Sequence, residues 1–303
     1  MKKTEGEFLS CSGVLLDMIT WLPEDSPRAV VQIMHGMAEH MGRYDEVGGF
    51  LASHGILTVG ITYPGHGKKA EIPGYFGEEG WDILLKDEEA LRVVTAEEHP
   101  GIPYFILGHS MGSFLARCYL MENGNKLSGA VLSGTGWYPP LLAGTGLLLA
   151  RFFSLIGYKK KPCGPVNAIA FSANNKPFEP GRTPFDWLSR DKGRVDSYIA
   201  DPYCGFTFTA NGFASMFDGL KRLTRLDDLK KIPKTLPVYF LSGDKDPVGQ
   251  MGKGVRTVEQ QFRVAGLTDV TCRLYPDGHH EMLNETNRRE VMEELLAWLN
   301  EKI

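Results

Sequence analysis

Six short, mostly apolar runs constrain the fold of this chain more than any other feature of its sequence. They are AVVQIM at 29–34, ILTVGI at 56–61, PYFILG at 103–108, GAVLSG at 129–134, PVYFLSG at 237–243 and VTCRLY at 270–275. Runs of this length and character are typical of strands that are buried on both faces of a parallel sheet. We therefore expect a central, mostly parallel β-sheet.

Helical patterns separate several of these runs. Apolar side chains recur at helical spacing in residues 81–98, 111–122, 252–265 and 282–300. The first twenty residues look like a hairpin, with Gly13 near its turn. Strands and helices that alternate in this way predict an α/β fold, with helices covering both faces of the sheet.

One long segment breaks the alternation. Residues 136–218 contain an apolar stretch and then a stretch rich in proline and asparagine, without a strand–helix repeat. The segment is too long for an ordinary loop, so we expect it to form a small, largely helical unit of its own. We call residues 136–218 the cap, and expect it to be inserted between core residues 1–135 and 219–303.

Charge and cysteine content argue against several partners and cofactors. The formal net charge is -4 and no run of like charge is longer than Lys159–Lys161, whereas nucleic-acid binding needs a basic field. The five cysteines are widely spaced and form no CxxC pair, which predicts neither a disulfide framework nor a zinc site. Acidic residues follow the first lysines, and no apolar signal region does. We expect a cytoplasmic protein with no nucleic-acid partner and no metal.

The clearest chemical motif surrounds Ser110. The residues Gly108-His109-Ser110-Met111-Gly112 match G-x-S-x-G, with an apolar run before them and a helical pattern after them. In this strand–turn–helix context, small neighbours allow a sharp turn that lifts the serine hydroxyl above the sheet. A turn without function rarely needs small residues on both sides of its serine. Ser110 is therefore the predicted nucleophile.

A serine hydroxyl needs a base, and the base needs an orienting acid. After a motif of this type, the acid and then the histidine are expected downstream, in loops that follow strands. Asp244 and Asp246 follow the run at 237–243, and we prefer Asp246 because it lies farther out on the loop. His279 and His280 follow the last run, and we favour His280. The sequence HHE is not HExxH, which argues against a zinc protease.

Two backbone N–H groups are expected to bind the oxyanion that forms when a serine attacks a carbonyl. Met111, the residue after the nucleophile, supplies one of them. The other is expected in the loop after an earlier strand, where His35-Gly36-Met37 makes the N–H of Met37 available. The alternative for that loop alone is an ordinary glycine turn.

These motifs, taken together, resemble those of the monoacylglycerol lipase and lysophospholipase family of α/β-hydrolases, which has esterase and S33-type peptidase relatives. The segments that show this resemblance are HGMAEHMGRYDEVGGFLASHGILTVGITYPGHG, GHSMGS, LSGDKDPVG and YPDGHHEMLNE, with FDWLSRD and DPYCGF in the cap. The resemblance implies an α/β-hydrolase fold, a Ser110–Asp246–His280 triad, oxyanion donors at Met37 and Met111, a mobile cap and no cofactor. Thr62 departs from the family, which often has an aspartate there.

The cap opens with crowded leucines and phenylalanines between residues 141 and 156, and Lys159–Lys161 follow. One interpretation is a helix that packs on the core. The other is an interfacial helix that dips into lipid, with the lysines at anionic headgroups, which predicts a peripheral membrane contact. The candidate substrate-binding residues are Leu148, Phe152, Trp187 and Phe206 in the cap, with Gly36 and His109 in the core.

The sequence thus predicts a serine hydrolase that cleaves a carboxylic ester of a single-chain lipid, either a monoacylglycerol or a lysophospholipid. A short-chain esterase and an aminopeptidase are the nearer alternatives. A peptidase would need cap acids to converge on the pocket, and those available are Glu179, Asp186, Asp191, Asp196 and Asp201. A non-catalytic binding protein is more distant, because no triad member is missing. The sequence does not fix the oligomeric state.

Overall fold

The computed structural model describes all 303 residues and is built on one eight-stranded sheet. The strands are β1 (Lys2–Leu9), β2 (Leu15–Leu22), β3 (Ala29–Met34), β4 (Ile56–Ile61), β5 (Tyr104–His109), β6 (Gly129–Ser133), β7 (Val238–Gly243) and β8 (Val270–Tyr275). Their order across the sheet is β1-β2-β4-β3-β5-β6-β7-β8. The six strands β3 to β8 are parallel to one another. β1 and β2 form the expected hairpin, with Gly13 at a φ of 83° in its turn. The mostly parallel α/β fold is confirmed.

Alternating side chains of the central strands belong to two separate hydrophobic cores, one on each face of the sheet. In β5, Ile106 belongs to one core, whereas Phe105 and Leu107 belong to the other. β6 repeats the alternation, with Leu132 on one side and Val131 on the other. Successive side chains of a strand point to opposite faces, so an unbroken apolar run needs cover on both sides.

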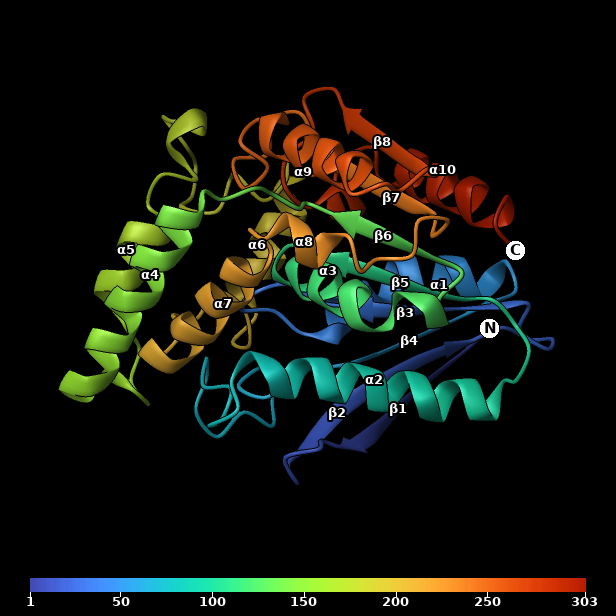
Figure 1. Cartoon of the computed structure of the whole chain (residues 1–303), viewed down its shortest axis with the longest axis horizontal. Coiled ribbons are helices and arrows are strands. Elements are labelled where there is room, and N and C mark those ends of the chain that lie inside the picture. Colours follow the sequence, from blue (N-terminus) through green and yellow to red (C-terminus); the bar gives the residue numbers. More distant parts are fainter.

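Helices provide that cover. They are α1 (Asp45–Ser53), α2 (Trp81–Glu98), α3 (Met111–Asn123), α4 (Pro140–Phe153), α5 (Gly164–Phe171), α6 (Lys192–Ala200), α7 (Ala210–Arg222), α8 (Leu226–Leu229), α9 (Lys253–Val264) and α10 (Arg288–Asn300). The larger core takes side chains from α2, α3 and α9, and the smaller one from α1 and α10. Figure 1 shows the sheet between these two helical layers.

The last helix begins later than its sequence pattern predicts. The expected helix at 282–300 starts only at Arg288, and Met282–Asn284 form a separate 3-10 turn. The reason is that Met282 and Leu283 are buried as part of the loop from β8, and Glu285 has extended backbone that ends the turn. Apolar residues that pack from a loop thus imitate the start of a helix.

The long excursion between β6 and β7 carries helices and no strand. β6 and β7 are direct neighbours in the sheet, although helices α4 to α8 separate them in the chain. Figure 1 shows α4 and α5 stacked at one side of the molecule, with α7 between α4 and α3. The expected boundary of the cap at residue 218 falls inside α7, and the division into core and cap stays a prediction.

Helix α4 has two contrasting faces. Ala143, Leu147 and Ala150 are buried, whereas Leu141, Leu148 and Phe152 are 78%, 67% and 55% exposed. By length and composition, Pro140–Tyr158 is the one helical stretch that could cross a membrane. Its small buried residues instead join the larger core and pack α4 against α7.

Candidate active site

Ser110 lies in a strained turn between β5 and α3. Its φ of 53° and ψ of -119° are rare for a residue with a side chain, and its N–H donates to the carbonyl of Ser133 at 2.9 Å. A Cβ atom on Gly112 would lie 2.0 Å from the carbonyl oxygen of Met34, and one on Gly108 would lie 2.4 Å from that of Gly112. The two glycines are therefore required by close backbone approach.

His280 and Asp246 are hydrogen-bonded to each other in the interior. His280 Nδ1 donates to Asp246 Oδ1 at 3.0 Å, and both side chains are buried. The same carboxylate accepts the N–H of Val248 at 2.8 Å and the hydroxyl of Ser242 at 3.2 Å. These contacts fix its orientation toward the imidazole. Asp244, the other candidate, accepts the N–H of Asp277 instead.

The environment of His280 raises the pKa of its imidazole. Burial lowers this pKa, but the charge of Asp246 and its hydrogen bond raise it, and Glu281 and Glu39 act in the same direction. The net pKa lies above the ordinary value of 6.5. His280 is therefore a stronger base than a free histidine and accepts a proton more readily.

The loop of residues 35–40, which we call the oxyanion loop, lies against the serine. A Cβ atom on Gly36 would lie 3.2 Å from the Cβ of Ser110 and 2.7 Å from a carboxylate oxygen of Glu39. The ring of His35 fixes the start of the loop, since its Nε2 accepts the N–H of Tyr63 at 3.0 Å. Met37, the next residue after Gly36, faces the same cavity as Ser110 and Met111.

A buried ion cluster connects this loop to the histidine loop. The guanidinium of Arg43 pairs with both oxygens of Glu281, at 2.8 and 2.7 Å, and also contacts Glu39. Glu39 accepts the N–H of Gly36 and the hydroxyl of Tyr44 as well. Burial raises the pKa of Glu39, but the charges of Arg43 and His109 and the hydrogen bonds from Tyr44 and Gly36 together lower it by more, so this pKa lies below 4.5. The guanidinium of Arg43 therefore lies between two carboxylates in the interior.

A cavity of about 950 Å³ opens between the core and the cap, and most of its lining residues are hydrophobic. The predicted site residues that line it are Gly36, Met37, His109, Ser110, Met111, Trp187, Phe206 and His280. Asp246 lies behind His280. Leu148 and Phe152 do not line the cavity and are 67% and 55% exposed, so the expectation that they contact substrate there is wrong.

The cap acids that a peptidase would need do not converge on the cavity. Of the five candidates only Glu179 lines it. Asp186 accepts the N–H and hydroxyl of Thr183, and Asp196 pairs with Arg182 within the cap. Asp191 caps α6 and Asp201 binds His40.

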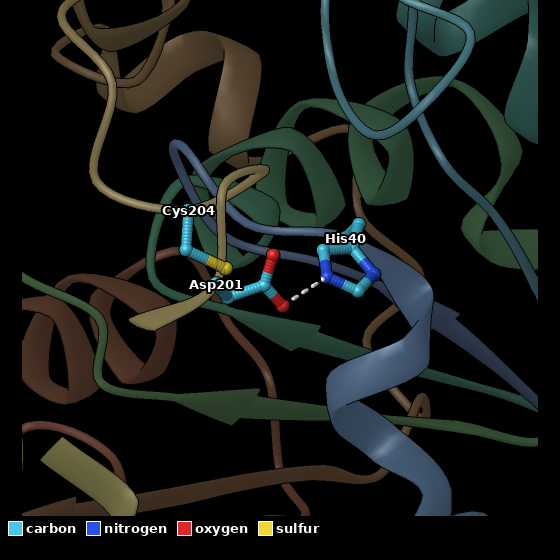
Figure 2. A group of neighbouring side chains, drawn as sticks. All are labelled: His40, Asp201 and Cys204. Atoms are coloured by element: carbon cyan, nitrogen blue, oxygen red, sulfur yellow. Dashed lines mark hydrogen bonds and ion pairs between the residues drawn. The ribbon is translucent and has the colours of Figure 1, made fainter. Parts of the chain in front are cut away.

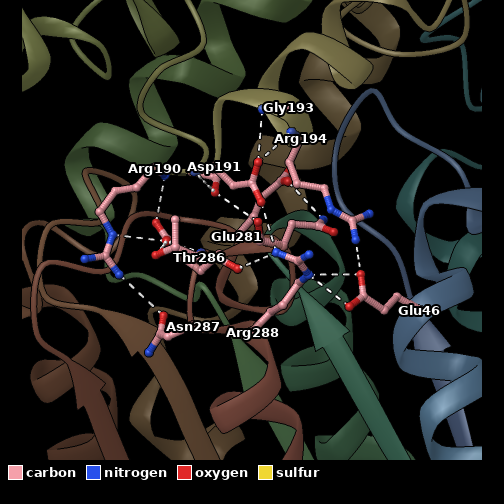
Figure 3. A network of polar contacts seen from close by, with 12 residues as sticks. Glu46, Arg190, Asp191, Gly193, Arg194, Glu281, Thr286, Asn287 and Arg288 are labelled. Carbon is pink, nitrogen blue, oxygen red and sulfur yellow. Dashed lines mark hydrogen bonds and ion pairs between the residues drawn. The ribbon is translucent and has the colours of Figure 1, made fainter.

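Part of the cap is fastened directly to the loop that carries His280. The N–H groups of His280 and Glu281 donate to the carbonyls of Trp187 and Leu188, at 3.3 and 2.8 Å. The ring of Trp187 also packs on that of His280, with centroids 5.1 Å apart. Figure 3 shows the adjoining polar network, in which Arg190 pairs with Glu285, Arg288 joins Asp191 to Glu46, and Arg194 binds Glu46.

One side-chain group resembles a metal site in composition. His40, Asp201 and Cys204 bring a nitrogen, an oxygen and a sulfur within 4.8 Å of one another (Figure 2). However, His40 Nδ1 accepts the N–H of Gly42, so the ring proton belongs on Nε2, which donates to Asp201 at 2.9 Å. A metal-bound histidine normally donates from its second nitrogen, and here that nitrogen already accepts. The geometry therefore favours a hydrogen-bonded link.

Comparison with known proteins agrees with this architecture. Residues 25–287 match the family described as serine aminopeptidase, S33. The chain belongs to this family. It is also 28% identical to a monoacylglycerol lipase from Mycolicibacterium smegmatis, over 98% of this chain and 97% of the relative, and 25% identical to human monoglyceride lipase, over 98% and 88%. A carboxyl esterase from Bacillus coagulans, solved in complex with glycerol, shares 30% identity with a TM-score of 0.92, over 99% and 98% of the two chains.

This member of the S33 family is therefore an α/β-hydrolase. The sequence interpretation missed the polar end of its cavity, formed by Glu39, Arg43 and Glu281. A signal was available, because Glu39 and Arg43 are spaced four residues apart in a loop close to the predicted oxyanion donor. An acid and a base at that spacing can pair, but only the fold brings Glu281 to them.

Proposed function

We propose that this hydrolase cleaves the carboxylic ester of a monoacylglycerol through an acyl-enzyme on Ser110. The observation that carries the proposal is that Ser110, in its strained turn, and His280, held by Asp246, face one large apolar cavity. An apolar cavity of this size accommodates an acyl chain, while a few polar groups fix the reacting end. The lipases and the esterase that resemble this chain support an ester substrate.

In the mechanism that we propose, these groups act in two steps. His280 removes the proton of the Ser110 hydroxyl, which attacks the ester carbonyl, and the N–H groups of Met37 and Met111 stabilise the oxyanion. His280 then protonates the departing glycerol oxygen, which leaves the acyl group on Ser110. Water, activated by His280, releases the fatty acid. Asp246 keeps the imidazole oriented and stabilises its charged form.

The charges that line the cavity favour an uncharged leaving group. Arg43 is its only lysine or arginine, and two carboxylates already neutralise that cation. Glu179 adds a further negative charge. A phosphate would find no free cation to bind, whereas the hydroxyl groups of glycerol can form hydrogen bonds with the carboxylates. Monoacylglycerol is therefore the better substrate of the two that the sequence left open.

The first experiment compares hydrolysis of a monoacylglycerol, a lysophosphatidylcholine, a short p-nitrophenyl ester and an aminoacyl amide, with Ser110→Ala as the blank. We expect kcat/KM for the monoacylglycerol to exceed that for the lysophospholipid by at least about tenfold, equivalent to about 1.4 kcal/mol for the unmatched phosphate. Full activity of the Ser110→Ala variant would rule out the mechanism. Release from the amide alone would favour a peptidase and make Glu179 the next residue to change.

We further propose that α4 brings the enzyme to its substrate at a membrane surface. Leu141, Leu148 and Phe152 expose apolar side chains along this helix. Leu155 is exposed in the helical turn Ser154–Tyr158 that follows, and Lys159–Lys161 come next. An apolar face with basic residues beside it matches an interfacial helix on anionic lipid.

Co-sedimentation with anionic vesicles tests this contact. A variant with Leu148, Phe152 and Leu155 changed to Ser is expected to lose most vesicle binding while keeping activity on the short, soluble ester. The matched control changes Leu9 and Val264 to Ser, because these side chains are exposed to a similar degree elsewhere on the surface. Equal binding by both variants would refute the membrane role of α4.

A further inference from the structure

The outer side of the oxyanion loop is held by the cap. On its inner side, the core fixes the loop through His35 and Tyr63 and through the hydroxyl of Thr62, which accepts the N–H of Met41 at 3.2 Å. On its outer side, the loop meets residues 198–205, which run from the end of α6 to Gly205. This part of the cap contacts the loop at Ala38 and His40.

Ala38 needs external support because its backbone is strained. Its φ is 51°, a left-handed conformation that costs a residue with a side chain about 1–2 kcal/mol. Such a conformation persists only when the surroundings fix it. The carbonyl of Ala38 accepts two hydrogen bonds from the cap, from the N–H of Gly205 at 2.9 Å and from the hydroxyl of Tyr198 at 3.3 Å.

His40 provides a third attachment, two residues farther along. Its Nε2 donates to Asp201 Oδ2 at 2.9 Å (Figure 2). Asp201 Oδ1 accepts the N–H of Tyr203 at 2.8 Å. A backbone N–H group of the cap thus orients the Asp201 carboxylate independently of the contact with the oxyanion loop. The other ring nitrogen of His40 caps the following turn through the N–H of Gly42.

We propose that Tyr198, Asp201 and Gly205 are positioning residues, through which the cap holds the oxyanion loop in the conformation that presents the Met37 N–H. This inference rests on the proposed function, since it assumes that Met37 supplies an oxyanion donor. A cap that only covers the substrate would affect large lipids alone. A cap that also supports the loop contributes to turnover of every ester, including esters too small to need a lid.

Asp201→Ala separates these two roles when a short, soluble p-nitrophenyl ester is the substrate. Loss of one oxyanion donor costs about 10²–10³ in turnover, and a loosened donor is expected to cost less, about 5–50-fold in kcat, with KM little changed. Affinity for a short trifluoromethyl ketone, which forms a tetrahedral adduct with the serine, is expected to fall by a similar factor. Asp196→Ala is the control, since Asp196 lies on α6, just before Asp201 in the chain, but pairs with Arg182 inside the cap.

Two conservative variants distinguish a local effect on the oxyanion loop from a general loss of folding. Asp201→Asn keeps an acceptor for His40 and is expected to recover most of the kcat lost in Asp201→Ala. Tyr198→Phe removes only the hydroxyl that binds Ala38, and is expected to lower kcat and ketone affinity together. Unchanged kcat and ketone affinity in Asp201→Ala and Tyr198→Phe, while Ser110→Ala is inactive, would overturn this inference and leave the proposed function intact. Ester hydrolysis by the Ser110→Ala variant would instead refute the proposed function on which this inference rests.

Discussion

Among single residues, Asp246 shows how much of the site was accessible from the sequence. Motif order and the loop after a strand favoured Asp246 over Asp244, and in the structure Asp246 is the aspartate that meets His280. Its burial and its bonds to Ser242 and Val248 could not be predicted, because they depend on how the loop folds back.

The pH dependence of kcat/KM tests the role of Asp246. His280 must be neutral to act as a base, and its raised pKa places the acid limb of the wild-type profile above about pH 6.5. In Asp246→Asn the main group that raises this pKa is lost, so the limb is expected to move to lower pH while activity falls by about 10⁴-fold. Asp244→Asn is the control and leaves both the limb and the rate nearly unchanged. An acid limb that stays in place in Asp246→Asn would contradict the assignment.

Among the individual elements, fully buried strands were predictable from the sequence. A helix with one buried and one exposed face was less predictable. The runs that became β3 and β4 match their strands at both ends. Within α4, however, Leu147 is buried and its neighbour Leu148 is exposed, although both are leucines in one apolar run. A helix that is apolar all round gives no signal for its inward face, which is why Leu148 and Phe152 were misassigned to the cavity.

The contact between α4 and α7 offers a test of acyl-chain selection. A Cβ atom on Gly146 of α4 would lie 2.8 Å from the ring of Phe217 on α7, and both residues line the cavity. Gly146→Ala is therefore expected to displace this ring and to lower kcat/KM for long-chain esters more than for short ones. Gly144→Ala is the matched control, since a Cβ there meets nothing within 4 Å. Identical chain-length profiles for the two variants would exclude this role.

For the whole molecule, the α/β architecture was predictable because strands buried on two faces leave a strong and simple pattern. The site was less so, because its parts come from residues near 36, 43, 110, 246 and 280, which only the folded sheet brings together. Sequence motifs found the candidate nucleophile and the candidate base. They did not reveal the ion cluster around Arg43, which needs the three-dimensional arrangement of two distant loops.

A buried acid in the larger core predicts how stability varies with pH. Glu88 of α2 is fully buried, and one of its oxygens has only the amide of Gln32 as a partner while the other has none. Burial raises the pKa of Glu88 to about 8, so the folded chain keeps a proton that the unfolded chain releases near pH 4.5. Glu88 therefore contributes stability that is lost as pH rises from about 4.5 to about 8, by at most about 1.4 kcal/mol per pH unit.

Thermal unfolding between pH 6 and 9 checks this effect. Glu88→Gln stays neutral, so its Tm is expected to fall less than that of the wild type as pH rises. Glu97→Gln, at an exposed position of the same helix, is expected to follow the wild type. A wild-type curve that runs parallel to that of Glu88→Gln would show that this carboxyl group does not control the slope.

Because β6 and β7 are adjacent, the whole excursion between them could be exchanged for that of another hydrolase without altering the order of the sheet. A chimera made in this way would inherit a new acyl chamber. It would also inherit new neighbours for Ala38 and His40, which the native excursion contacts through Tyr198, Asp201 and Gly205. Chimeras that keep residues 198–205 should therefore retain more turnover than chimeras in which the whole excursion is exchanged. On this scaffold, the substrate range would then not evolve independently of catalysis.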